Sequence, residues 1–183
     1  GEFLAPLGLA TSEDMTASFA RQIITFAREG ADAVLIETMT DLGEITCALR
    51  AAKENSDLPV VCSMTFDKGV KGCATMMGVK PNDAVHALED AGADAVGSNC
   101  GWGIETIIEV ARIMRSETEL PLWFKPNAGM PELVDGKTIY SETPEKTTSH
   151  IAELIEAGAG IIGGCCGTTP EHIRRIREVI DAV

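Results

Sequence analysis

Several features that whole classes of protein require are missing from this sequence. No run approaches the roughly 20 consecutive apolar residues of a membrane-spanning helix, although 45% of the 183 residues are hydrophobic. Basic residues are scarce: the sequence has 15 lysines and arginines but 28 acidic residues, which gives a net charge of −13. This balance argues against nucleic acid and anionic membrane as partners. No secretory signal is present, and six cysteines in a chain with a substantial apolar core are typical of a cytosolic protein rather than of a disulfide-bonded one, so we expect a cytoplasmic protein.

What the sequence does contain is a repeated pattern. In three segments a helix closes on glycine and a short buried strand follows: "EGADAVLIET" from Glu29, "AGADAVGSNC" from Ala91 and "AGAGIIGGCC" from Ala157. Two further segments have proline at a strand entry, where its missing N–H does no harm: "DLPVVCSMTF" from Asp57 and "ELPLWFKPNA" from Glu119. The pattern therefore predicts five strands, near residues 32–37, 59–65, 94–100, 121–127 and 160–165.

Helical signals fill the intervals between these strands. "IETIIEVARIM", from Ile104, places its apolar residues on one helical face. Two helices are predicted to begin at Thr-Pro-Glu signatures, from Thr143 and from Thr169, where threonine caps and proline takes the first turn. With a leading helix near residues 12–29, the order is one α followed by five βα units, and no linker divides it.

Consecutive βα units occur in open doubly wound sheets and in closed (βα)₈ TIM barrels. A doubly wound nucleotide binder would usually have a glycine-rich phosphate loop after its first strand, and here Glu37-Thr38-Met39-Thr40-Asp41 follows instead. A barrel typically needs about 250 residues. We therefore interpret residues 1–183 as a single α/β domain that supplies a leading helix and the last five βα units of a (βα)₈ barrel, with the N-terminal part absent.

In such barrels the chemistry lies at the carboxyl ends of the strands. The predicted strand ends carry Glu37, Thr65, Phe66, Asn99, Cys100, Asn127, Cys165 and Cys166. Three thiols from two strand ends suit tetrahedral Zn²⁺ with one position left open, as in a catalytic zinc site. The adjacent pair can reach one ion if the backbone bends, and the glycines that flank it supply that freedom.

Plainer interpretations remain for each of these residues. Adjacent cysteines can be two small buried side chains or a strained vicinal disulfide, and Glu37 can simply cap the next helix. Cys47 and Cys62 are expected to be buried apolar residues, and Cys73 lies in a loop without an assigned role. The three histidines (His86, His150 and His172) fall in helical stretches and are expected to be surface or hydrogen-bonded side chains rather than ligands.

Four strings together resemble the homocysteine S-methyltransferase family, including the homocysteine-binding module of cobalamin-dependent methionine synthase. They are "GADAVLIETMTDLGE", "GSNCGWG", "FKPNAGMPELVDGKTIY" and "GGCCGTTPEHI", and they span almost the whole chain. The resemblance implies a zinc-bearing (βα)₈ barrel that binds homocysteine through the metal. "KPNAG" leans toward the cobalamin-linked branch of the family.

Residue by residue, the resemblance implies that Cys100, Cys165 and Cys166 hold the zinc. It assigns Glu37 to the amino group of the substrate and places Asn99 in the substrate site. Asn127 matches an asparagine close to the metal that can serve when substrate is absent. The family's first strands, with an aspartate-glycine motif that also holds homocysteine, have no counterpart here.

The expected reaction follows from the chemistry of thiols. A free alkyl thiol has a pKa near 8.5 and is mostly protonated at neutral pH, whereas coordination to Zn²⁺ removes the proton. The resulting thiolate can attack a methyl group, which we expect from methylcobalamin carried by another domain or protein, to give methionine.

Three alternatives remain. A non-catalytic barrel fragment could hold a structural zinc, whose fourth ligand would come from Asn127 or Cys73. The enzyme could use another methyl donor, such as S-methylmethionine. A thiol-redox enzyme is a further rival, although no C-x-x-C motif supports it.

Overall fold

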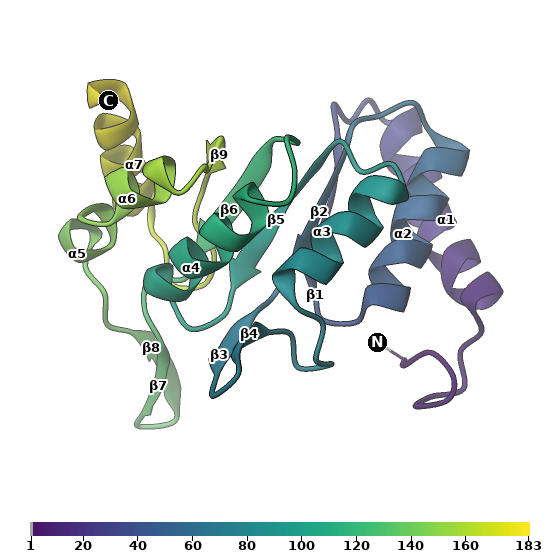
Figure 1. The fold of residues 1–183 in the computed structure, drawn as a ribbon, viewed down its shortest axis with the longest axis horizontal. Coiled ribbons are helices and arrows are strands. Elements are labelled where there is room, and N and C mark those ends of the chain that lie inside the picture. The colour runs from purple at the N-terminus through teal and green to yellow at the C-terminus, as the bar shows by residue number, and fades with distance from the viewer. Residues whose placement is uncertain (1) are drawn as a thin grey trace.

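A five-stranded parallel sheet forms the centre of the computed structural model, which describes residues 2–183 (Figure 1). Its strands, in spatial order, are β1 (Val34–Met39), β2 (Val60–Met64), β5 (Ala95–Cys100), β6 (Leu122–Pro126) and β9 (Ile161–Ile162). The spatial order equals the chain order, as expected for consecutive βα units. The five predicted strands are confirmed, with boundaries shifted by a few residues.

The helices also follow the predicted order. They are α1 (Ser12–Arg28), α2 (Leu42–Asn55), α3 (Pro81–Asp90), α4 (Ile104–Arg115), α5 (Pro144–Thr148), α6 (Ile151–Glu156) and α7 (Pro170–Ala182). The expectation of one helix per unit is wrong between β6 and β9, because the chain breaks at Ser149 and His150 into α5 and α6. No helix within residues 2–183 has the length and apolarity needed to cross a membrane.

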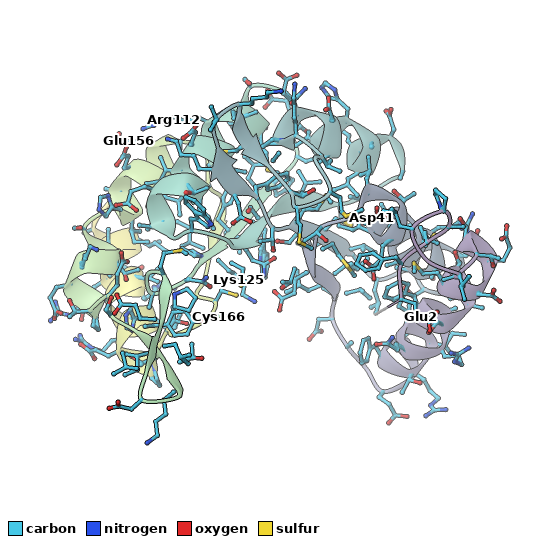
Figure 2. The ribbon with its side chains drawn as sticks, turned by 90° about the horizontal axis from the view of Figure 1, so that it is seen from below. Glu2, Asp41, Arg112, Lys125, Glu156 and Cys166 are labelled. Carbon is cyan, nitrogen blue, oxygen red and sulfur yellow. The ribbon has the colours of Figure 1, made fainter. Side chains whose placement is uncertain are left out.

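The two faces of the sheet have different surroundings. Figure 2 shows the chain as an arch, with the helices on its outer side and the sheet curving inside them. On β1, Val34 and Ile36 are buried in the core beneath the helices, whereas Leu35 on the opposite face is 37% exposed. Period-two alternation of this kind places the side chains of one strand on both faces. The concave face is thus where side chains of the strands remain accessible.

Two short antiparallel hairpins interrupt the βα pattern. The first, β3 (Asp67–Gly69) with β4 (Gly72–Ala74), follows β2, and the second, β7 (Pro131–Val134) with β8 (Lys137–Tyr140), follows β6. Both extend from the same end of the sheet (Figure 1). Neither hairpin is predicted from the sequence, and Cys73, expected in a loop, lies buried on β4.

Candidate metal centre

Three cysteine sulfur atoms meet at the carboxyl ends of β5 and β9. Cys165 Sγ lies 3.4 Å from Cys100 Sγ, and Cys100 Sγ lies 3.6 Å from Cys166 Sγ. All three lie within 4.8 Å of one another, and they form the one such group of histidine, cysteine and acidic side chains found among the described residues. A tetrahedral Zn²⁺ with Zn–S bonds of about 2.3 Å holds its sulfur atoms about 3.8 Å apart. The sulfur positions therefore fit this metal closely.

The backbone is bent to bring these sulfurs together. Cys100 ends β5 with φ 63° and Thr38, near the end of β1, has φ 64°. The left-handed conformation costs an L-residue about 1–2 kcal/mol, and such strain persists where the surrounding structure imposes it. At the other loop Gly167 has φ 78°, and a Cβ there would lie 2.3 Å from the Cβ of Tyr140. Only glycine fits that position, directly after the cysteine pair.

Asn99 connects the cysteine loops to two other strands. Its side chain is fully buried. Its Oδ1 accepts from the Thr38 backbone N–H at 2.9 Å and from the Ser63 hydroxyl at 2.7 Å. Its Nδ2 donates to the Thr38 hydroxyl at 2.7 Å and points at Cys165 Sγ at 3.7 Å. Asn99 thus links the thiol cluster to β1 and β2 through hydrogen bonds.

Asn127 joins the two cysteine loops to each other. Its Nδ2 donates to the Gly101 carbonyl at 3.0 Å, and its Oδ1 accepts from the Cys166 backbone N–H at 3.0 Å. The side chain is only 4% exposed. Both ends of the amide are therefore used to hold backbone on either side of the cluster.

The three thiols influence one another's protonation. Burial, followed by hydrogen bonds with the other two thiols, raises the pKa of Cys100 to about 12. Burial also raises the pKa of Cys165, but hydrogen bonds from Asn99 and from the other cysteines outweigh it and hold this pKa below its ordinary value. The hydrogen bond with Cys166 raises the pKa of the Tyr140 hydroxyl. The cluster therefore distinguishes one thiol that favours the thiolate from one that resists it.

Glu37 lies on the concave face, where it pairs with a residue that the sequence analysis did not single out. Lys125 Nζ on β6 lies 2.6 Å from Glu37 Oε2 on β1, and their side chains are 19% and 37% exposed. Figure 2 shows Lys125 and Cys166 together on the inner side of the arch. The alternative that Glu37 caps the next helix is not what the structure shows, because Asp41 is the residue whose side chain caps α2.

The remaining sequence expectations can be placed in the same way. Cys47 and Cys62 are buried, as predicted. His172 is buried and hydrogen-bonded, with its Nδ1 accepting from the Thr169 backbone N–H at 3.1 Å. Thr65 borders the site through its hydroxyl, which donates to the Asn99 carbonyl at 3.1 Å. Phe66 is buried in the core.

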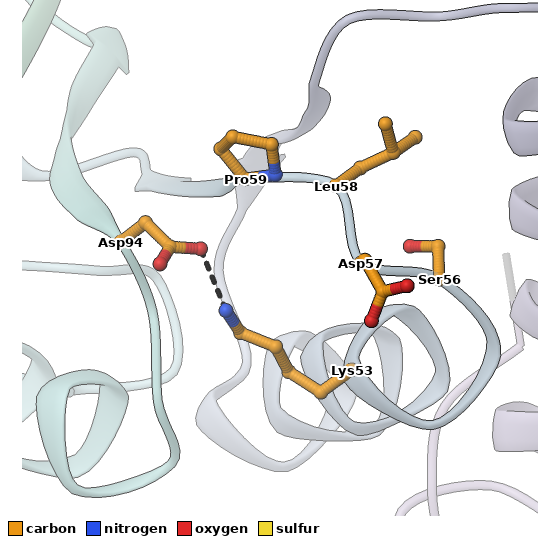
Figure 3. A pocket seen from close by; sticks show the side chains of 6 residues that line it. All are labelled: Lys53, Ser56, Asp57, Leu58, Pro59 and Asp94. Atoms are coloured by element: carbon orange, nitrogen blue, oxygen red, sulfur yellow. Dashed lines mark hydrogen bonds and ion pairs between the residues drawn. The ribbon is translucent and has the colours of Figure 1, made fainter.

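A separate surface pocket of about 310 Å³ lies at the opposite end of the sheet, lined by Lys53, Ser56, Asp57, Leu58, Pro59 and Asp94 (Figure 3). Asp94 directly precedes β5, and its carboxylate pairs with Lys53 Nζ at 2.6 Å and accepts from the Val60 backbone N–H at 2.7 Å. The hydrogen bond from Lys53 is the main cause that lowers the pKa of Asp94. In barrels this amino-terminal end serves stability rather than chemistry.

Comparison with known proteins bears on both the fold and the family. The family described as homocysteine S-methyltransferase matches residues 1–180. The methionine synthase of Mycobacterium leprae is 34% identical over 158 residues, which are 82% of this chain and 13% of that protein. The methionine synthase of Mycobacterium tuberculosis is 33% identical over the same length. The chain therefore spans about an eighth of the curated relatives that it matches.

Solved structures show the same architecture. The apo form of the homocysteine methyltransferase MmuM from Escherichia coli superposes with a TM-score of 0.76 at 23% identity, over 93% of this chain and 58% of that one. The carboxyl transferase domain of Rhizobium etli pyruvate carboxylase superposes with a TM-score of 0.55 at 15% identity, over 91% of this chain. These likenesses confirm the predicted fold, in which the parallel sheet is part of a TIM barrel. The match over residues 1–180 shows that the chain belongs to the homocysteine S-methyltransferase family.

Proposed function

We propose that this chain is the thiol-activating part of a zinc-dependent homocysteine S-methyltransferase, which methylates homocysteine to methionine. The observation that carries the proposal is the convergence of three cysteine sulfurs, at 3.4 and 3.6 Å, on the carboxyl edge of a parallel sheet. Family membership and the methionine synthase relatives support the same reaction. When bound, Zn²⁺ supplies the Lewis acidity that keeps a substrate thiol deprotonated at neutral pH.

Each residue of the site has a defined part in this proposal. Cys100, Cys165 and Cys166 hold the metal through their sulfurs. Glu37 receives the substrate ammonium on the concave face. Asn127 holds the two cysteine loops together through both ends of its amide, so that the three sulfurs stay in place whether or not substrate is bound.

The methyl transfer is a nucleophilic substitution. The substrate sulfur uses a lone pair to form the S–CH₃ bond, and the donor leaves with the electron pair of the bond that breaks. We propose methylcobalamin, carried by another domain or protein, as the donor. Support comes from the methionine synthase relatives, which are several times longer than this chain.

The geometry favours an open metal site over a structural one. A structural zinc is closed by four protein ligands. Of the two candidates for a fourth ligand, Asn127 already bonds backbone at both ends of its amide. Cys73 lies outside the three-cysteine group that the described residues form. An exogenous thiol therefore has a place at the metal.

We further propose that residues 1–183 belong to a single homocysteine-binding (βα)₈ barrel domain, of which they supply the last five βα units, and that this domain is cytoplasmic. The chain aligns with 58% of MmuM, and the concave face exposes Leu35 and Ile161 where a barrel would enclose them. Six free thiols suit a reducing compartment.

The test combines metal analysis with spectroscopy. Protein loaded with Co²⁺ in place of Zn²⁺ should show thiolate-to-metal absorption, and homocysteine should intensify it as a fourth sulfur binds. Methyl transfer should then be measured with methylcobalamin and, separately, with S-methylmethionine. A cobalt spectrum unchanged by homocysteine would favour the structural zinc, and activity with S-methylmethionine alone would reassign the donor.

A further inference from the structure

An ion pair crosses the concave face of the sheet, the face on which Figure 2 shows Lys125 and Cys166. Lys125 belongs to β6 and Glu37 to β1, and β5 and β2 lie between these strands. Flat strands about 4.8 Å apart would hold β1 and β6 about 14 Å from each other, yet the two charged atoms lie 2.6 Å apart. The curvature of the sheet brings the two side chains toward each other over its inner face.

The surroundings of Lys125 hold its side chain in this position. Its Cγ lies 3.2 Å from the point where Gly163 would carry a Cβ, so the aliphatic stem packs against the backbone directly after β9. Asn99, which touches Cys165, is the register partner of Lys125 on β5. Thr38, the neighbour of Glu37, bonds to the same asparagine. Both charges are therefore fixed to the framework that supports the thiols.

The ion pair also has unused hydrogen-bonding capacity. An ammonium group carries three donors and a carboxylate about four acceptor positions. Among residues 2–183, the one hydrogen bond of the Lys125 ammonium is to Glu37, and that of the Glu37 carboxylate is to Lys125. A positive and a negative group, adjacent and partly exposed, remain able to bind a second pair of charges.

We propose that Lys125 and Glu37 together recognise the zwitterion of an α-amino acid thiol. Lys125 binds the α-carboxylate while Glu37 binds the α-ammonium, and the thiol reaches the cysteine cluster. The proposal rests on the function proposed above and adds a residue that determines specificity. Two opposite charges side by side select a ligand with both groups on one carbon, and they disfavour thiols that lack either group, which leave one charge unpaired.

A rival arrangement makes the opposite prediction. If Lys125 merely occupies the place of the substrate ammonium, removing it frees Glu37 and strengthens homocysteine binding. If the pair is only structural, removing it changes the binding of all thiols equally or not at all. Whether removal of Lys125 weakens, strengthens or leaves unchanged the binding of each thiol therefore distinguishes zwitterion recognition from the other two arrangements.

The experiment measures binding of three thiols to the Co²⁺-loaded protein, by calorimetry and by thiolate-to-metal absorption. The thiols are homocysteine, 4-mercaptobutanoate, which lacks the amino group, and 3-aminopropanethiol, which lacks the carboxylate. The variants are Lys125→Met, Lys125→Arg and Glu37→Gln. Lys53→Met is the matched control, because it breaks an ion pair of the same 2.6 Å length at the opposite end of the sheet.

Lys125→Met should weaken binding of homocysteine and 4-mercaptobutanoate by about 10- to 100-fold, the range of a charged hydrogen bond, and leave 3-aminopropanethiol unchanged or tighter. Glu37→Gln should weaken homocysteine and 3-aminopropanethiol instead, and Lys125→Arg should retain most of the affinity. Tighter homocysteine binding by Lys125→Met, or equal changes for all three thiols, would overturn the assignment. If no thiol alters the wild-type cobalt spectrum, the proposed function fails as well, so the two failures are distinguishable.

Discussion

Replacing Asn99 with aspartate should weaken metal binding while preserving the fold. The two side chains have nearly the same shape, so the oxygen that accepts from Thr38 N–H at 2.9 Å and Ser63 at 2.7 Å is retained. The Thr38 hydroxyl can rotate and donate where it now accepts. The contact with Cys165 Sγ at 3.7 Å is lost, because the amide donor is replaced by an anionic oxygen that cannot donate to sulfur.

The magnitude follows from the charges. Three protonated thiols are neutral, whereas three thiolates with a divalent ion carry a net charge of −1, so a carboxylate beside them opposes loading. Two unit charges about 4 Å apart repel by about 1 kcal/mol in water and about 4 kcal/mol at an effective dielectric constant of about 20. The site is partly exposed, so an intermediate value applies. This agrees with the 10- to 100-fold loss of affinity typical when a group supporting a metal ligand is changed.

Competition with a chromophoric chelator would measure the zinc affinity of both proteins, with Asn82→Asp as a control that adds the same charge at the start of α3. Asn99→Asp should lose about 10- to 100-fold in affinity and should also melt below the wild type, because its carboxylate is fully buried, whereas Asn82→Asp should lose little zinc affinity. Unaltered zinc affinity in a folded Asn99→Asp protein would refute the claim that this amide supports the thiolate.

Three further outcomes are expected. Cys166→Ser should lose most of its zinc by metal analysis, whereas Cys47→Ser, buried in α2, should retain it; equal retention would remove Cys166 from the ligand set. Gly167→Ala should lower the free energy of unfolding by more than the 1–2 kcal/mol of a left-handed residue, because the added Cβ would lie 2.3 Å from a tyrosine side-chain carbon; a denaturation midpoint like that of the wild type would contradict this. The hydrogen bond from Arg174 lowers the pKa of Glu171 from 4.5 to about 2. The stabilisation that the ionised Glu171 gives the folded state is therefore present above about pH 4.5 and is lost as the pH falls through about 2. The Glu171→Gln variant should therefore melt slightly below the wild type at pH 7 and at nearly the same temperature near pH 2. A difference in melting temperature that grew on acidification would contradict this pH dependence.

The strands and the thiol cluster could be predicted because their signals are local. Buried strands of apolar residues, three of them preceded by a helix that closes on glycine and two by a proline at the strand entry, define the βα units. Strand polarity then brings Cys100 and the Cys165–Cys166 pair to one edge. The hairpins escaped prediction because their strands have only three or four residues each, too few for a period-two pattern to be recognised. The break between α5 and α6 likewise lacks a proline or glycine signal.

The contacts that position the site could not be predicted in this way. The left-handed backbone of Thr38 and Cys100 belongs to residue types that rarely adopt it. The pairing of Lys125 with Glu37 spans four strands and depends on the curvature of the sheet, which no short segment encodes. These features arise from tertiary packing, so the sequence revealed the metal ligands more readily than their supports.

The choice of asparagine beneath the thiols follows from what the neighbours require. The position must accept from a backbone N–H and a buried hydroxyl, and it must also present a donor toward sulfur. Aspartate cannot donate when ionised, and lysine cannot accept. A charged side chain would also have to be desolvated at this position, where the Asn99 side chain has no exposed surface. A neutral amide satisfies both directions of hydrogen bonding, and it leaves the charge of the site to the thiolates, the metal and the ion pair on the concave face.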